Sequence, residues 1–284
     1  MSDRRFGLFV TGLGVLCLTP DALLVRLISC DPFTLLFWRG VLMSTGLSVY
    51  FLAQRRLPRP GFKPLLAGGF LALSTTCFVL SLQLTQAANT LIIIATSPLL
   101  AAVFARLFLK ETVRRETGLA IAVAMAGVGL SVSGSWARGS WPGDVFAAGS
   151  AICMAGHFTS LRWWRSEEGP VAVWWAGWLA ALIALPRAAP LSVERVDVFW
   201  LGLLGLVVLP TAFGLMAVGP RYLPAPEDGL MLLAETVLGP FWVWMVLWER
   251  PDPTTLVGGL VVIATLAGHA LTVPSVTEPE TVSG

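Results

Sequence analysis

Five ionisable residues lie well inside long apolar segments of the chain: Asp21, Arg39, Arg106, His157 and Glu235. If these segments cross a membrane, a charge at their centre costs about 2.5–3.5 kcal/mol. Such groups usually face a bundle interior or an aqueous cavity, which makes them candidates for a solute site or a proton path. Arg106, like Arg26, lies close enough to a span end for its long side chain to snorkel to water.

Asp21 and Arg39 flank the connection between the first two apolar segments. Each lies about seven or eight residues from the turn at 29–32, or roughly 10–12 Å deep at 1.5 Å per helical residue. Because antiparallel neighbours at equal depth can meet, we expect an ion pair or a shared polar cluster. A purely structural pair and a role toward substrate are equally open.

Glu235 and His157 are expected at one level near the middle of the membrane. Glu235 is roughly 12 Å from the inner end of its segment, and His157 is roughly 19 Å below the outer end of its own. Carriers tend to place their sites near this level. A carboxylate and an imidazole there could exchange a proton and couple proton movement to solute exchange. The alternatives are a packing carboxylate and a structural histidine.

The composition supports a membrane setting for these charges. Of 284 residues, 56% are hydrophobic and 13% are charged, against about 25% charged in soluble domains. The net charge of +2 and the absence of basic runs argue against a nucleic-acid partner. The four cysteines are scattered without ligand spacing, so we expect no metal and no cofactor.

Ten apolar runs are long enough to cross a bilayer, which predicts an all-α integral membrane protein. The first run lacks a cleavage site and is expected to remain as a span. The connections are short and rich in Pro, Gly and charge, so no soluble domain is expected between spans. The runs are 6–28, 32–53, 64–84, 89–109, 116–134, 143–163, 170–186, 196–218, 228–248 and 254–273.

Lys and Arg residues predict the orientation of the spans. With a cytoplasmic N-terminus, twelve of these residues fall on the cytoplasmic side and four on the far side. Both termini are therefore expected inside: a short N-terminus at 1–5 and a polar, disordered tail at 274–284. The expected location is the plasma or inner membrane, with multiple passes through the lipid bilayer.

Prolines and polar or aromatic side chains add candidates for a binding pocket. A proline within a span frees a carbonyl one turn earlier and kinks the helix, and two of these prolines lie near Asp21 and Glu235. Most of the twelve tryptophans are expected at the membrane interfaces. The helix-kink candidates are Pro20, Pro98, Pro210 and Pro240; the pocket-lining candidates are Gln83, Gln86, Asn89, Trp174, Trp178 and Trp244.

The chain also repeats itself weakly. Residues 87–111, "AANTLIIIATSPLLAAVFARLFLKE", are matched at 225–249 by "APEDGLMLLAETVLGPFWVWMVLWE", and a Gly-rich span follows each copy. Glu111 and Glu249 each end a helix, where they should bond a neighbouring loop or an opposing helix end. The glycines of the Gly-rich spans allow close helix contact, either internally or across a homodimer interface: Gly127, Gly129, Gly258 and Gly259.

With five spans per half, the second copy must be inverted in the membrane, as in many secondary transporters. The two halves are 6–134 and 142–273. On the segment "SPLLAAVFARLFLKE", its degenerate copy "ETVLGPFWVWMVLWE" and the "FWRG" at 37–40, the sequence resembles an EamA-type drug/metabolite transporter with two EamA repeats. Thr236 stands where proline is common in that pattern. The resemblance implies a ten-helix carrier for small organic metabolites, often an exporter.

The function expected from the sequence is secondary-active transport of a small organic solute, amino-acid-like or otherwise amphipathic, by alternating access. Export and coupling to protons or exchange are both compatible with it. An intramembrane enzyme is the main alternative, but the chain has no HExxH or GxSxG motif and only two histidines, far apart. A non-transporting assembly subunit is the other, and it predicts a long loop or added domain.

Overall fold

The computed structural model describes residues 3–55, 61–110, 115–164, 169–216 and 225–272, and these residues form helices and short connections without strands. Glu111 and the tail at 274–284 lie outside the described residues. The elements are α1 (Asp3–Leu18), α2 (Asp21–Leu27), α3 (Pro32–Ala53), α4 (Phe62–Leu84), α5 (Ala87–Ile94), α6 (Ser97–Phe108), α7 (Arg115–Arg138), α8 (Trp141–Trp163), α9 (Gly169–Ala184), α10 (Arg195–Gly202), η1 (Leu203–Val208), α11 (Leu209–Met216), α12 (Ala225–Leu247) and α13 (Pro253–Thr272).

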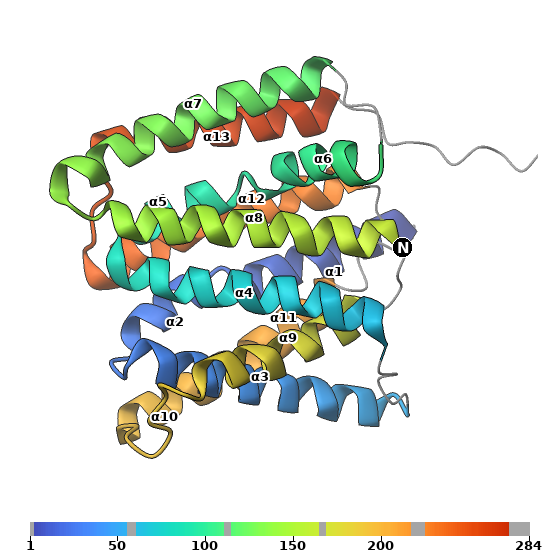
Figure 1. The fold of residues 1–284 in the computed structure, drawn as a ribbon, viewed down its shortest axis with the longest axis vertical. Coiled ribbons are helices and arrows are strands. Elements are labelled where there is room, and N and C mark those ends of the chain that lie inside the picture. Colours follow the sequence, from blue (N-terminus) through green and yellow to red (C-terminus); the bar gives the residue numbers. More distant parts are fainter. Residues whose placement is uncertain (1–2, 56–60, 111–114, 165–168, 217–224, 273–284) are drawn as a thin grey trace, which may run out of the picture.

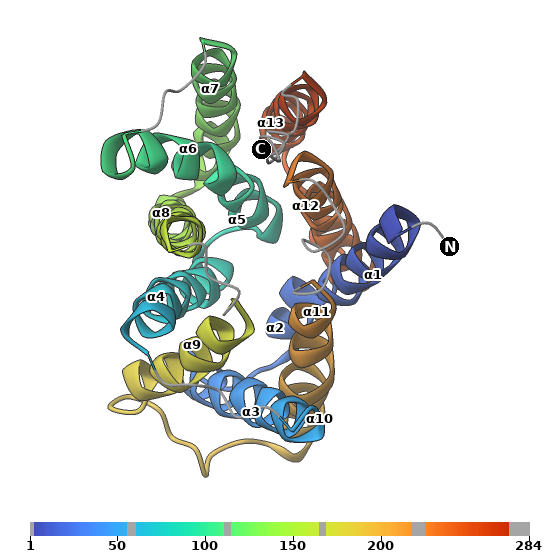
Figure 2. The same cartoon turned by 90° about the vertical axis from the view of Figure 1, so that its right-hand side faces the viewer.

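The helices lie side by side along one common direction, with their connections gathered at the two ends of the bundle (Figure 1). α7 and α13 form one edge, and α3 and α10 form the other. Seen end-on, α4, α5, α8 and α9 lie on one side of the bundle, and α1, α11 and α12 lie on the other (Figure 2). α2 lies between these two groups, close to the middle.

Two spans are interrupted where proline removes a backbone donor. Between α1 and α2, Pro20 deprives the Leu16 carbonyl of its usual partner, and the Thr19 hydroxyl donates to that carbonyl instead, at 2.9 Å. α5 and α6 are similarly separated just before Pro98, where the Thr96 hydroxyl bonds a carbonyl of the preceding turn. At the first interruption, the carbonyl that Pro20 leaves without a backbone donor is therefore satisfied by a side chain of the same span.

The other two candidate prolines behave differently. Pro210 follows η1, a six-residue π-helix that replaces regular α-helix between α10 and α11. α12 continues through Pro240 as one element, so this proline does not interrupt its helix as Pro20 and Pro98 do.

Facing glycines bring two pairs of helices into close contact. A Cβ on Gly40 of α3 would collide with the Gly177 carbonyl of α9, and one on Gly177 would lie 2.6 Å from the Gly40 carbonyl. Gly127 of α7 and Gly258 of α13 oppose each other in the same way, with 2.9 Å between a Cβ on Gly127 and the Gly258 carbonyl. Gly127 and Gly258 of the Gly-rich spans therefore serve internal packing.

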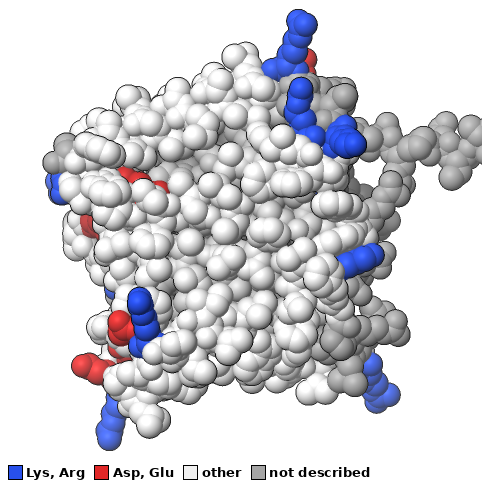
Figure 3. Space-filling view, in the orientation of Figure 1, with Lys and Arg blue, Asp and Glu red and all other residues white. Residues whose placement is uncertain are grey.

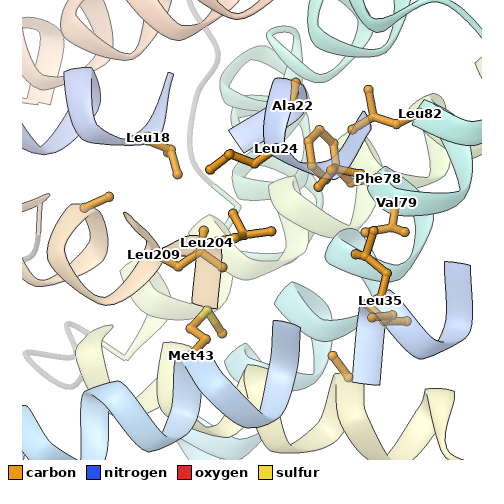
Figure 4. Packing of buried hydrophobic residues seen from close by; sticks show 14 of the residues in the cluster. Leu18, Ala22, Leu24, Leu35, Met43, Phe78, Val79, Leu82, Leu204 and Leu209 are labelled. Atoms are coloured by element: carbon orange, nitrogen blue, oxygen red, sulfur yellow. The ribbon is translucent and has the colours of Figure 1, made fainter. Parts of the chain in front are cut away.

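The remaining helices pack against neighbours from both halves of the chain. α8 packs against α4, α5 and α6, while α1 packs against α11 and α12. α4 also packs against α9, and α3 against η1 and α11. The apolar core lies where α1, α2, α3, α4, η1 and α11 converge, and Figure 4 shows Leu24, Phe78, Leu82 and Leu204 meeting there.

The outer surface of the bundle suits a lipid environment. Large apolar side chains are exposed along many helices, among them Leu119, Val196 and Leu260, each at least 66% exposed. Charged residues gather toward the two ends of the helices and leave the middle of the visible face without charge (Figure 3). Within the part of the chain that the structure describes, six helical segments are long and apolar enough to cross a bilayer. The chain is thus a helical membrane protein.

Candidate functional site

Asp21 and Arg39 form the ion pair that the sequence predicts. Asp21 begins α2, immediately after the interruption at Pro20, and Arg39 comes from the neighbouring α3. The Arg39 guanidinium binds both carboxylate oxygens, through Nη1 to Oδ1 and through Nη2 to Oδ2 at 2.8 Å. The two residues are only 4% and 5% exposed. This is a bidentate, buried pair, the geometry in which charge-assisted hydrogen bonds are strongest.

Arg39 has further capacity for interaction. Its guanidinium lies over the Phe78 ring of α4, 5.6 Å from the centroid, in a cation–π contact. Its Nε is buried without a hydrogen-bond partner. A buried donor without a partner is costly, so the arrangement leaves one Arg39 hydrogen available to another acceptor.

Glu235 belongs to the same charge cluster. It is partly buried on α12, near enough to Asp21 and Arg39 for their charges to act on its carboxylate. α12 packs directly on α2, and Trp242 Nε1 donates to the Thr19 hydroxyl at the α1–α2 interruption, at 3.0 Å. The charge cluster, defined here as Asp21, Arg39 and Glu235, therefore joins α2, α3 and α12 at the break in the first span.

His157 has a different setting. It is buried on α8, and its Nδ1 is 2.8 Å from the Ala67 carbonyl of α4. α8 packs against α4, α5, α6 and α7, whereas α12 packs against α1, α2, α5 and α13. The recorded electrostatic partners of Glu235 are Asp21 and Arg39. The contact to Ala67 fits the structural alternative for His157, and its pairing with Glu235 stays a prediction.

Asn89 lies within a buried polar cluster. It is fully buried on α5, and its carbonyl oxygen accepts from Ser131 at 3.0 Å and from Thr255 at 2.7 Å. Its amide nitrogen donates to Ser135 and, at 3.4 Å, to Asp144. These bonds tie α5 to α7, α8 and α13. Asn89 therefore holds helices together in this structure.

The remaining pocket candidates are spread over several surroundings. Gln83 and Gln86 line an open pocket of about 300 Å³ at the end of the bundle opposite the termini. Trp174 Nε1 donates to Ser48 at 2.8 Å and thereby joins α9 to α3. Trp178 and Trp244 are 38% and 43% exposed, and neither lines this pocket.

A second ion pair, formed by Arg26 and Glu249, lies beside the open pocket. Arg26 Nη2 is 3.1 Å from a Glu249 carboxylate oxygen and also donates to the Thr85 carbonyl at 2.7 Å. Glu249 accepts from the backbone N–H of Ala87, the first residue of α5, at 2.8 Å. The expectation that Glu249 bonds an opposing helix end is confirmed. Arg26, for which the sequence predicts snorkelling to water, is 22% exposed at this end of the bundle and also has these protein partners.

The described residues contain no group of three or more His, Cys, Asp or Glu side chains arranged to hold a metal ion. The charge cluster offers two carboxylates and a guanidinium with a spare donor, and Phe78 beside it adds an aromatic face. These groups can bind charged and polar parts of a solute or exchange a proton.

Comparisons with known proteins agree with this architecture. The sequence model of the EamA-like transporter family matches the chain twice, over residues 6–133 and 141–270. A search of curated proteins gave no match. A solved crystal structure of another protein is similar in fold, with a TM-score of 0.66 and 18% identity over 95% of this chain and 99% of that one. The chain belongs to the EamA-like transporter family, and is thus a membrane transporter of the drug/metabolite type.

Proposed function

We propose that this protein is a secondary-active transporter that moves a small organic solute across the plasma or inner membrane by alternating access. The observation that carries the proposal is the charge cluster of Asp21, Arg39 and Glu235, which lies at a helix interruption. Interrupted helices inside a membrane bundle are typical of carrier sites, because irregular backbone is tolerated where it lines a binding site.

The charges of the cluster suggest what it binds. With all three groups ionised, the cluster holds two carboxylates and one guanidinium, which leaves one negative charge in excess. An uncompensated charge is costly away from water. A proton on Glu235 or a positively charged group of the solute would balance it. The cluster therefore suits an amino-acid-like or otherwise amphipathic solute, with proton exchange at Glu235.

An inverted relation between the two halves is part of the proposal. It predicts that the first span (α1 and α2) packs on the eighth (α10, η1 and α11) and the ninth (α12). In the same way, the sixth span (α8) should pack on the third (α4) and the fourth (α5 and α6). The contacts of α1 with α11 and α12, and of α8 with α4, α5 and α6, support this pattern. The facing glycines of α3–α9 and α7–α13 join spans that such a relation would exchange with each other. Exchanging the conformations of the halves would open the site to each side in turn.

The proposed orientation places both termini in the cytoplasm. Its support is the distribution of Lys and Arg, twelve against four, over the short connections. Export is the favoured direction because the family resemblance points to exporters. The orientation of the chain and the direction of transport do not depend on the charge cluster.

The proposal is tested by comparing the metabolites that accumulate outside cells with and without the protein. Cells carrying Glu235→Gln provide the site variant, and Glu194→Gln, an exposed glutamate preceding α10, provides the matched control. We expect at least one small organic solute to accumulate outside with the wild-type protein and with Glu194→Gln, and less with Glu235→Gln. No difference across a broad panel of solutes would contradict transport of organic metabolites.

A further inference from the structure

We propose that Arg26 and Glu249 form the outer gate of the carrier, a positioning pair that must separate for the site to open at the end of the bundle opposite the termini. The inference rests on the proposed transport function. It follows from which elements the pair joins, what lies on each side of it, and how it is connected to the charge cluster.

The pair closes a junction of three segments. Arg26 stands on α2, Glu249 follows α12, and both bond the connection between α4 and α5, through the Thr85 carbonyl and the Ala87 N–H. Gln86 in the same connection donates to the Arg250 carbonyl at 3.2 Å. The first, third, fourth and ninth spans are thus fastened together at one end.

The pair lies between an open pocket and a closed gap in the bundle. Arg26 and Glu249 both line the open pocket of about 300 Å³. Glu249 also lines a narrow gap whose other walls include Ala88, Pro240 and Val243. Ala88 and Val243 are only 5% and 1% exposed. Separating the pair would therefore expose surface that is now closed off beneath Glu249.

The same helices carry the gate and the charge cluster. α2 is a seven-residue helix with Asp21 at its start and Arg26 near its end, and α12 carries Glu235 and leads to Glu249. Because the chain is interrupted at Pro20, α2 can shift as a short rigid unit relative to α1. A solute or proton that changes the contacts of Asp21 would move Arg26 with it. Both residues of the pair are about one-quarter exposed, so water can replace their contacts when they part.

A nearby ion pair provides a matched control. Arg138 at the end of α7 pairs with Asp252 just before α13, at the same end of the bundle. α7 and α13 are in addition packed together through Gly127 and Gly258. Breaking this second pair should therefore leave its helices together.

The test measures thiol reactivity instead of transport. The background is a variant in which the four native cysteines are replaced by serine: Cys17, Cys30, Cys77 and Cys153. In this background, Ala88→Cys reports on the gap beneath Glu249. The purified full chain is labelled with a charged maleimide in lipid nanodiscs. We expect Arg26→Gln and Glu249→Gln each to raise the labelling rate about tenfold, the effect of losing roughly one charged hydrogen bond. Asp252→Asn should leave the rate unchanged.

Two results would overturn the gate. One is an equal labelling rate with and without the pair, and the other is an equal increase in Asp252→Asn, which would mean general loosening of this end. Val243→Cys replaces Ala88→Cys if the latter does not fold. The labelling assay needs no solute, so it is independent of transport. If the pair variants leave the labelling rate unchanged while the wild-type protein exports a solute, the gate alone is rejected. If they raise the labelling rate while the wild-type protein exports no solute, the transport function alone is rejected.

Discussion

Arg39 on α3 binds both carboxylate oxygens of Asp21 on α2, and this buried pair lies one residue beyond the proline that interrupts the first span. The pair joins the two arms of the first hairpin at a point where the backbone cannot continue as a regular helix. Glu235 approaches it from α12.

Breaking the Asp21–Arg39 pair from one side should destabilise the protein. Asp21→Asn or Arg39→Gln alone leaves a buried charge without its partner, at a cost of about 3–5 kcal/mol. The double substitution removes both charges and should recover most of the lost thermal stability in detergent. If the double variant also regains full transport, the pair is structural only. Single variants that melt like the wild type would contradict the buried pair itself.

Glu235→Gln should flatten the dependence of solute export on pH. Glutamine keeps the size and polarity of the side chain but cannot gain or lose a proton in the working range. The measurement is the initial export rate between about pH 5.5 and 8.5, a range that includes the ordinary pKa of histidine. An unaltered profile would exclude Glu235 as the proton carrier.

Two glycines on α7 should differ sharply in their tolerance of a side chain. A Cβ at Gly127 would lie 2.9 Å from the Gly258 carbonyl, whereas one at Gly129 would have nothing within 4 Å. We expect Gly127→Val to lower the melting temperature and the yield of folded protein, because α7 and α13 must move apart. Gly129→Val is the control and should behave like the wild type; equal losses would contradict the close contact.

Cys30, in the connection between α2 and α3, should react slowly with maleimides at neutral pH. Burial, reinforced by the negative charge of Asp197 and Asp31, raises the pKa of the Cys30 thiol to about 11. Since the thiolate is the reactive form, the labelling rate should rise about tenfold per pH unit below that pKa. A rate that levels off near pH 9 would contradict the raised pKa.

The contribution of Asp197 to Cys30 can be isolated. Asp197→Asn removes the negative charge and should lower the pKa of the thiol, which speeds labelling at a fixed pH near 8. Asp197 also accepts hydrogen bonds from Ser29, so Ser29→Ala serves as a control for the loss of its side-chain bond. Faster labelling in Ser29→Ala alone would point to loosening of the connection instead of electrostatics.

For a charged residue in a span, the sequence predicts the depth in the membrane but not which helices surround the side chain. Depth was sufficient for Asp21 and Arg39, because residues at equal depth on adjacent arms of one hairpin can meet and these two have opposite charges. It was insufficient for Glu235 and His157, whose common level does not reveal which helices surround each of them. In the structure, the charges of Asp21 and Arg39 act on Glu235, whereas His157 bonds the Ala67 carbonyl.

Helix interruptions, too, could be predicted only in part from the sequence. Proline signals a missing donor, and the chain is interrupted at Pro20 and before Pro98. At Pro20 the Thr19 hydroxyl bonds the freed Leu16 carbonyl, whereas α12 continues through Pro240, so a proline alone does not determine where a helix ends. Arg26 could not be assigned from position alone, because its partners lie about 60 and 220 residues away in sequence.

The central claim, that the protein is a carrier working through the charge cluster, is tested most directly by solute exchange in proteoliposomes. The solute is the one identified by comparing external metabolites, and uptake of its labelled form is measured with and without unlabelled solute inside. A carrier that alternates between two openings predicts saturable uptake that internal solute accelerates, and loss of this acceleration in Glu235→Gln but not in Glu194→Gln. Uptake that rises linearly with concentration and ignores internal solute would contradict alternating access.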